Sequence, residues 1–281
     1  MQSTARSILW LGFFGIILAA WWWMYAMSTG MGLDLLGRQA GMPMDMGAKP
    51  AMEMGAEIQS GAESGGDTGA DMDMSMKMMT RFTPLFVMWA GMMAAMMLPT
   101  MLPTLRAYED LMVSADGSRA GWLGVLLGYF VVWVGFAAVI TGVQLGLLRS
   151  GLINMMGTLQ FTWLTAALLI VVGLFQFSRT KEICHGVCHS PMGYFLGHWH
   201  TGFGGGVRMG LGLGVFCVGC CWGFMSLGFV GGVMNLTWMG LATLFMILEK
   251  LPQIGHVVTK PAGVLLVLAG IGVGVWPYLG G

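Results

Sequence analysis

Long apolar segments with almost no charged residues set the strongest limit on how this chain can fold. Only 9% of its 281 residues are charged, whereas soluble domains carry about 25%, and its mean hydropathy is +0.75. About 20 apolar residues are enough to cross a bilayer as a helix. The segments that qualify as candidate spans are 8–27, 82–102, 121–148, 161–177, 207–232, 236–250 and 262–279. The sequence therefore predicts an all-α, polytopic transmembrane helical bundle of about seven spans, with six as the fallback because the sixth segment is short.

The first apolar segment is expected to stay in the protein as an anchor helix within residues 1–27. Arg6 precedes it, and three consecutive tryptophans near its end resemble the aromatic belt of a membrane interface. A cleaved signal peptide would have a shorter apolar core and a small-residue cleavage site. Beyond the anchor we expect a long first loop over residues 28–81 and a metal-binding transmembrane domain over residues 82–281.

The first loop is rich in methionine. Its many glycine, alanine and acidic residues predict disorder, so the methionines have no core to fill. A thioether is a soft ligand that binds Cu(I) or Ag(I) and largely ignores Mg, Ca and Zn. Eight acidic and four basic residues give the loop a formal charge of −4, which would attract cations. The candidate copper ligands of the loop are Met42, Met44, Met46, Met52, Met54, Met72, Met74, Met76, Met78 and Met79.

The charged residues of the loops predict the orientation and the partners. Lys and Arg gather on the cytoplasmic side of membrane proteins, and an inside N-terminus places eight of them inside and five outside. This bias favours a bacterial inner membrane protein with the methionine-rich loop on the periplasmic side. The formal net charge of zero argues against nucleic acid and leaves the lipid bilayer and a metal ion as partners. Glu249 and Lys250 could form an ion pair at a helix end. Ionisable groups buried in a membrane are functional candidates, and the alternative is that these two, being near a helix end, are simply solvated.

The segment that follows the loop carries methionines at helical spacing. Residues four apart lie on one row of a helix, with Cβ atoms about 6 Å apart. Two such rows of methionine are present, and small residues between them permit close approach of a neighbouring helix. This pattern indicates a thioether path for Cu(I), although methionine as a flexible apolar packer explains it equally well. The candidate ligands are Met88, Met92, Met93, Met96 and Met97.

All five cysteines of the chain lie in one short region, which differs from the spread of a secreted disulfide framework. Cys184 and Cys188 are four residues apart, and Cys217 is followed by Cys220 and Cys221, so each set can share a helix face. Thiolates with thioethers form a Cu(I)-type ligand set. Thiolates with the neighbouring histidines form a zinc-type set, so the first pair could hold either metal.

The second cysteine set is expected near the middle of the bilayer. If the fifth span begins near Val207, Cys217–Cys221 lie about 15 Å along the helix, at the depth of Met92 and Met93. A single buried cysteine would mean little, because thiols are common buried apolar residues, but three in five residues indicate a site. The alternative is that the cysteines only pack and that the histidines lie at the membrane interface.

The methionine and cysteine segments also form motifs with fixed spacing. These are Met88-Trp89-x-x-Met92-Met93-x-Ala95-Met96-Met97-x-Pro99, Cys184-x-x-x-Cys188-x-Ser190-Pro191, Cys217-x-x-Cys220-Cys221-Trp222-x-x-Met225, Gly232-x-Met234-Asn235-x-x-Trp238-Met239 and Glu249-Lys250. Over about residues 82–275 the chain resembles a bacterial family of integral membrane proteins described as predicted metal-binding but of unknown function. The resemblance implies metal binding in the membrane and no particular reaction. The copper hypothesis therefore rests on the residues of this chain.

The leading interpretation is a copper-handling membrane protein, and we favour a non-catalytic role over an enzymatic one. The protein would capture Cu(I) on the external loop and pass it along the methionine rows to the cysteines. Transport, or delivery to a membrane cuproenzyme or a soluble copper carrier, would follow. One alternative is a membrane thiol oxidoreductase or electron-transfer subunit that uses the cysteine pairs. Another is an accessory structural subunit of a larger membrane complex, in which the methionines only pack and the loop is a tether.

Overall fold

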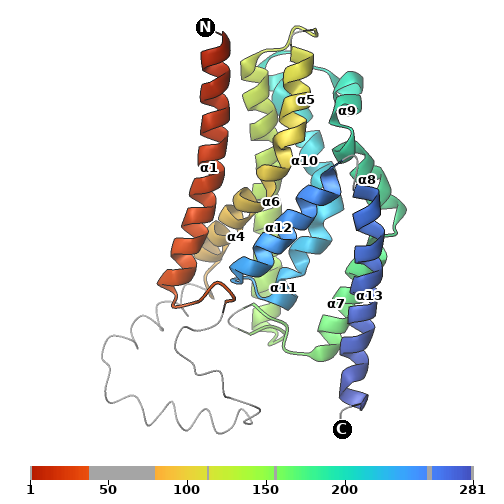
Figure 1. Ribbon diagram of the computed structural model, residues 1–281. Helices are drawn as coiled ribbons and strands as arrows, with labels where there is room; N and C mark the ends of the chain where they lie inside the picture. The colour runs from red at the N-terminus through yellow and green to blue at the C-terminus, as the bar shows by residue number, and fades with distance from the viewer. Residues whose placement is uncertain (1, 38–79, 113, 155–156, 252–254, 280–281) are drawn as a thin grey trace.

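The computed structural model describes residues 2–37, 80–112, 114–154, 157–251 and 255–279 as a bundle of helices (Figure 1). This arrangement confirms the predicted all-α fold class. The loop methionines lie outside the described residues, so the loop stays a prediction. The helices are α1 (Gln2–Gly30), α4 (Phe82–Met97), the 3₁₀ helix η1 (Pro99–Met101), α5 (Leu102–Met112), α6 (Arg119–Arg149), α7 (Thr162–Phe175), α8 (Arg179–His189), α9 (Pro191–His198), α10 (Gly202–Ser226), α11 (Gly228–Gly231), α12 (Leu236–Lys250) and α13 (Gly255–Leu279).

In the described part of the chain, five helical segments are long and apolar enough to cross a membrane. They are Thr4–Gly30, Phe82–Met112, Arg119–Arg149, Gly202–Gly231 and Val257–Tyr278. The pair α7 and α8 adds a sixth if it is counted as one span bent by 61°. Helix α12 has only 15 residues, or about 22 Å, which is shorter than a hydrocarbon core of about 30 Å. The described residues therefore give five or six spans instead of seven, and the upper figure equals the fallback.

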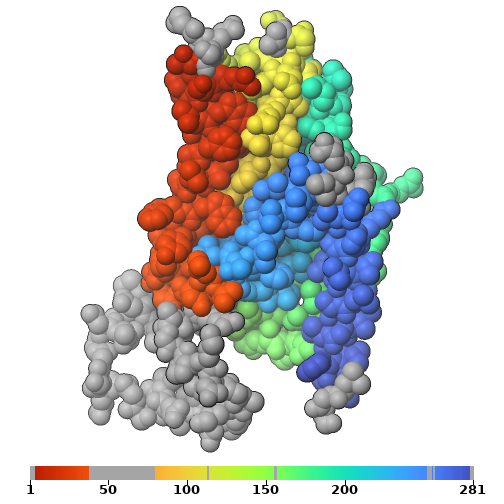
Figure 2. Space-filling view, viewed as in Figure 1, coloured from red at the N-terminus to blue at the C-terminus, as the bar shows by residue number. Residues whose placement is uncertain are grey.

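The outermost helices expose apolar side chains, as expected for a protein surrounded by lipid. Figure 2 shows α1 and α13 along opposite edges of one face, with α12 between them. Leu11 and Trp22 of α1 are 71% and 70% exposed, and Leu265 of α13 is 67% exposed. Exposed apolar surface of this extent is unusual for a soluble monomer. The helix lengths and this surface both fit a membrane environment.

Aromatic side chains of α1 pack on the small residues of α4. The indole Nε1 of Trp21 donates a hydrogen bond to the Ala95 carbonyl at 3.0 Å. The ring of Trp23 occupies the space that a Cβ at Gly91 would need. The small residues of the second span thus permit close helix approach, as the sequence predicts. This contact lies on the α1 side of α4.

Glycines let α6 and α10 touch backbone to backbone. A Cβ built on Gly206 would collide with the backbone of Gly121, and Gly210 meets the backbone of α6 in the same way. Small residues at four-residue spacing permit this close packing of transmembrane helices. The contact fixes the position of α6 along α10. It brings the hydroxyl of Tyr129 to the sulfur of Cys217 in the middle of α10, at 3.1 Å.

Two short helices end inside the bundle rather than at its surface. Helix α8 follows the 61° bend after α7 and begins at Ser178, whose side chain accepts a hydrogen bond from the backbone N–H of Lys181. Helix α12 begins at Asn235, whose side chain accepts from the backbone of its own first turn. The last turns of these helices carry Cys188 and Lys250, and both side chains are buried. The bend and the short length of α12 therefore position reactive side chains in the core.

Candidate metal centre

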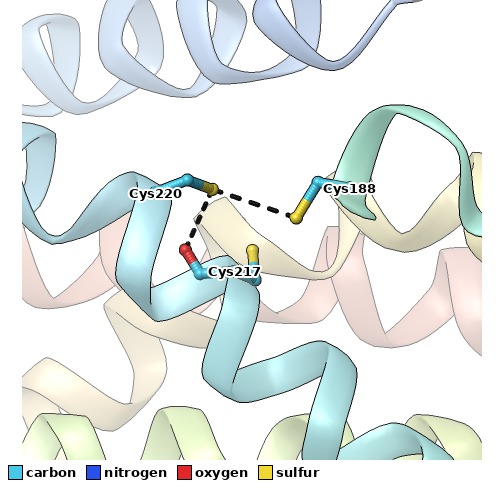
Figure 3. Close-up of side chains that lie close together, drawn as sticks. All are labelled: Cys188, Cys217 and Cys220. Atoms are coloured by element: carbon cyan, nitrogen blue, oxygen red, sulfur yellow. Dashed lines mark hydrogen bonds between the residues drawn. The ribbon is translucent and has the colours of Figure 1, made fainter. Parts of the chain in front are cut away.

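Three cysteine thiols from two helices converge in the middle of the bundle (Figure 3). Cys217 and Cys220 lie near the midpoint of the Gly202–Gly231 span, and Cys188 comes from the last turn of α8. The three sulfur atoms all lie within 4.8 Å of one another, and those of Cys188 and Cys220 are 3.9 Å apart. All three side chains are buried. The fold thus joins one member of the first cysteine set to two members of the second, and we call these three residues the cysteine group.

The spacing of the cysteine group suits a metal ion with sulfur ligands. Metal–thiolate bonds are about 2.3 Å long, so three sulfurs around one ion in a plane lie about 4.0 Å apart. The distance of 3.9 Å between two of the sulfurs is close to this value. Thiolate ligands select soft ions such as Cu(I) and also bind zinc. The group could therefore close around one ion with little movement of the helices.

The other two cysteines lie beside the cysteine group. The sulfur of Cys221 is 3.3 Å from that of Cys220, but it does not belong to the set of mutually close sulfurs. Cys184 is half-buried, and its sulfur lies against Gly219 of α10. All five thiols of the chain are free. Cys184 and Cys188 thus both face α10, as their spacing predicts, but only Cys188 belongs to the set of three mutually close sulfurs.

A lysine lies directly against the cysteine group. The Nζ of Lys250 donates a hydrogen bond to the Cys217 sulfur at 3.1 Å and another to Thr100 Oγ1 at 2.9 Å. The Tyr129 hydroxyl lies 3.1 Å from the same sulfur and 3.3 Å from Thr100 Oγ1. A buried ammonium is costly unless negative charge lies near it. Lys250 would therefore offset the negative charge of a metal held by thiolates.

A second buried lysine forms an ion pair that joins four helices. The Nζ of Lys181 lies 2.8 Å from Glu249 Oε1 and donates to the Cys220 carbonyl at 2.7 Å. Glu249 also accepts a hydrogen bond from Thr259 Oγ1 at 3.0 Å. The carbonyl oxygen of Glu249 lies 2.7 Å from His185 Nε2. These interactions tie α8, α10, α12 and α13 together around the cysteines.

Glu249 and Lys250 neither pair with each other nor lie in solvent, so both of these expectations are wrong, whereas their burial agrees with the alternative of a functional role. Both residues are buried, at 1% and 7% exposed, and they interact with different partners. The reason is that α12 ends in the core of the bundle rather than at a water interface. Sequence reasoning also missed Lys181, Thr100 and Tyr129. For Lys181 the sequence carried no signal of an ionisable residue within an apolar segment, because it lies in the polar stretch Ser178–Glu182 outside every predicted span.

The histidines near the cysteines do not join the cysteine group. The Nε2 of His185 interacts with the Glu249 carbonyl, and the His185 and His189 ring centroids are 5.1 Å apart. His189 lies against Gly255 at the start of α13. Within the described ranges, no cluster of three or more close metal-ligand atoms includes an imidazole. The thiolate and imidazole combination expected of a zinc-type site is therefore not assembled there.

The candidate methionines of the second span are all buried in the structure. On the side of α4 that faces α1, the small residues of α4 make the contact. The buried set is Met88, Met92, Met93, Met96 and Met97. Burial agrees with both the packing and the ligand interpretation of these residues. The loop set, Met42 to Met79, lies outside the described residues.

The structure corrects the expected depth of the cysteines relative to α4. Lys250 bridges Thr100 and Cys217, so the cysteine group lies level with Thr100 at the end of α4. Met92 instead lines a cavity together with Met225, about two turns further along α10. The cysteine group is thus displaced by about two turns of α4 from the expected level.

Comparison with known proteins places this region in a family. The model of the family described as "PpoB2: Copper chaperone" matches residues 86–273, which is more than half of the chain. The matched region contains the methionines of α4, every cysteine and both buried lysines. A search of curated proteins and a search of solved structures find no match.

Proposed function

This chain belongs to the PpoB2 copper chaperone family, and we propose that it captures Cu(I) and passes it between sulfur ligands inside a membrane. The ion would move from the methionine-rich loop, past the methionines of α4, to the cysteine group. It would then be transported, or delivered to a membrane cuproenzyme or a soluble copper carrier. In this proposal the protein binds and transfers Cu(I), and the ion is its cargo.

The observation that carries this proposal is the convergence of three buried thiols from two helices. Isolated buried cysteines are common packing residues, but three sulfurs within 4.8 Å of one another provide a ligand set for one soft ion. A thiolate buried alone in an apolar interior is costly. A bound Cu(I) offsets this cost, because it places a positive charge directly on the sulfurs.

The charges around the cysteine group are compatible with bound Cu(I). When two cysteines of the group are thiolates and the third keeps its proton, the Cu(I) complex carries a net charge of −1, and Lys250 supplies a neighbouring charge of +1 at 3.1 Å from Cys217. Lys181 and Glu249 form an ion pair and cancel each other. The assembly of ion, ligands and buried side chains is then neutral. Neutrality matters here because an uncompensated charge in a low-dielectric interior costs several kcal/mol.

We place the methionine-rich loop on the periplasmic side of a bacterial inner membrane. The distribution of Lys and Arg supports this orientation, and α1 ends at the same end of the bundle at which α4 begins (Figure 1). A cysteine introduced at Ser60 in a cysteine-free chain should react with a membrane-impermeant reagent added from outside. Labelling only from the inside would reverse the direction from uptake to export.

Cu(I) binding by full-length protein in detergent tests the proposal. X-ray absorption of the loaded wild-type protein should show sulfur ligation. The triple variant Cys188→Ser, Cys217→Ser, Cys220→Ser should lose tightly held copper and still fold. The matched control is Cys184→Ser, which removes a half-buried thiol outside the cysteine group and should keep the copper. A wild-type protein that holds no copper on sulfur after loading contradicts the proposal.

The capture step is tested separately on the loop. A peptide covering residues 42–79 should bind Ag(I) strongly and Zn(II) weakly, because its metal-binding side chains include neither thiolate nor imidazole. A competition titration between the two ions gives the ratio. Comparable affinities would remove the loop from the proposed path, while leaving the cysteine group to be judged by the preceding experiment.

A membrane thiol oxidoreductase is the second candidate, and one observation favours it. Cys188 and Cys220 are free, lie on different helices and have sulfurs only 3.9 Å apart, so a small shift would bring them to the bond length of about 2.05 Å. This function needs a disulfide that forms and breaks reversibly, and it tolerates loss of every loop methionine. Thiol titration of protein taken from cells with and without copper distinguishes the two candidates.

A further inference from the structure

A small cavity lies between α4, α10 and α12. Its volume is about 10 Å³, roughly the room that one water-sized sphere needs. Four buried methionines line it: Met92 and Met96 from α4, Met225 from α10 and Met239 from α12. We propose that this methionine cavity is a second binding site for a soft monovalent cation. The inference rests on the proposed function and adds a defined resting place for the ion before it reaches the cysteines.

The lining of the methionine cavity offers soft neutral donors alone. Thioethers bind Cu(I) and Ag(I) and largely ignore hard cations. The other lining residues are apolar or aromatic, and no side chain in the lining carries a carboxylate, an imidazole or a thiol. The indoles of Trp89 and Trp238 border the same space, and aromatic faces attract cations. This lining offsets no charge, so it favours a monovalent ion over a divalent one, whose larger charge costs more to bury.

One side of the methionine cavity adjoins the point where the first loop leaves the bundle. Met239 lies in the first turn of α12. In the same turn, Thr237 donates two hydrogen bonds to the Leu35 carbonyl, from its backbone N–H at 3.0 Å and from Oγ1 at 2.9 Å. Gly37, the last described residue before the methionine-rich loop, lies against Asn235. The loop therefore starts about one helical turn from the cavity.

The other side of the methionine cavity faces the cysteine group. Met225 follows Cys220 of the group by five residues, which is about 7.5 Å along the axis of α10. Met96 of α4 precedes Thr100 of η1 by four residues, and Thr100 is level with Cys217. The cavity thus lies between the loop and the cysteines on both helices. An ion held there would next meet thiolates, which are charged and therefore bind Cu(I) more tightly than thioethers do.

The test compares two double variants of the full-length protein in detergent, with Ag(I) as the probe. Met225→Leu with Met239→Leu removes two thioethers from the cavity and nearly preserves volume. The control is Met209→Leu with Met246→Leu, which changes buried methionines of the same two helices outside the lining. Equilibrium dialysis should show about one fewer Ag(I) per chain in the cavity variant than in the control.

A second measurement follows the absorbance of the Ag(I)–thiolate complex after rapid mixing. The cysteine group should fill about tenfold more slowly in the cavity variant, which corresponds to about 1.4 kcal/mol in the barrier. The control should fill at the wild-type rate. Equal stoichiometry and equal rates in the two double variants overturn the inference and leave these methionines as packing residues. If the cavity variant does not fold, Met92→Leu with Met96→Leu enters the same comparison.

The two proposals fail in different ways. If the triple cysteine variant holds as much Ag(I) as the wild type, the cysteine group is not a metal site and the proposed function fails. The methionine cavity still stands in that case when its variant loses an ion. If instead the cysteines bind Ag(I) and the cavity variant behaves as the control, the proposed function stands and the cavity inference is overturned.

Discussion

The cysteine group and the methionine cavity lie within about two turns of each other along α10 and differ in their electrostatic surroundings. The thiols are bordered by two lysines, a glutamate and a tyrosine. The thioethers are bordered by tryptophan, phenylalanine and small residues. Both regions offer sulfur, but only the first can compensate a charged complex. From this comparison we expect that the surrounding charges, more than the sulfur atoms, decide whether an ion is retained or passed on.

The largest difference between the two regions should appear in the free energy of unfolding that is lost when one side chain is removed. Lys181→Met leaves Glu249 buried without its cation, so we expect a loss of about 3–5 kcal/mol in the free energy of unfolding. The double variant Lys181→Met, Glu249→Leu should recover most of that loss, because no unpaired charge remains. Denaturant unfolding in micelles measures both. If Lys181→Met alone is as stable as the wild type, water reaches this ion pair and solvates Glu249.

Removal of one thiol should have the next largest effect, on affinity. Cys217→Ser replaces a soft ligand by a hard one, so we expect the affinity for Cu(I) to fall about 100-fold, or about 2.8 kcal/mol. Competition with a chromophoric Cu(I) chelator gives the value. Cys184→Ser is the matched change outside the cysteine group and should leave the affinity as it is. Equal losses in both variants would show that the three close sulfurs are not the ligands.

Replacement of the lysine beside the thiol should separate stability from metal binding. Lys250→Met removes a buried charge and keeps a long apolar side chain, so the copper-free protein should be as stable as the wild type or more so. The affinity for Cu(I) should fall about 30-fold, or about 2 kcal/mol, because residues that surround metal ligands tune affinity by 10- to 100-fold. The same titration and unfolding experiments report both quantities. Unchanged affinity would exclude charge compensation by Lys250.

A single substitution in the methionine cavity should have the smallest effect on stability. Met239→Leu should cost less than about 1.5 kcal/mol, because the two side chains have similar volumes. The affinity of the cysteine group at equilibrium should not change, since the site of the substitution is separate from it. Thermal unfolding and the chelator titration check the two expectations. If Met239→Leu instead causes a large loss of copper from the cysteines, the two regions act as one site rather than as two that differ.

The sequence was sufficient for the parts of the structure that depend on local pattern. Apolar length predicts the helical bundle, and the small residues of α4 predict its contact with α1. The depth of α12 was not predictable, because 15 apolar residues fit either a short span or a helix that ends in the core. The partners of Lys250 were hidden for the same reason. They come from η1 and α10, so they depend on tertiary packing that periodicity does not encode.

The cysteines show the same limit at the candidate site. Their clustering in the chain indicates a site, but the spacing pairs Cys184 with Cys188, whereas the fold pairs Cys188 with Cys217 and Cys220. The bend of 61° between α7 and α8 brings Cys188 to α10, and the chain shows no proline at that point. Met225 and Met239 stand in the quoted motifs but were not predicted as ligands, because no second methionine lies three or four residues from either of them. Only the meeting of three helices gives them a common cavity.

The glycine contact between α6 and α10 makes the geometry of the cysteine group depend on a residue that has no side chain. Gly206 lies about 16 Å along the helix axis from Cys217, yet an added methyl group there would push α10 away from α6. The hydroxyl of Tyr129 would then lose the Cys217 sulfur. The cysteine group is therefore anchored on the α6 side by contact between two backbones. On its other sides it meets α8 and α12 through the side chains of Cys188 and Lys250.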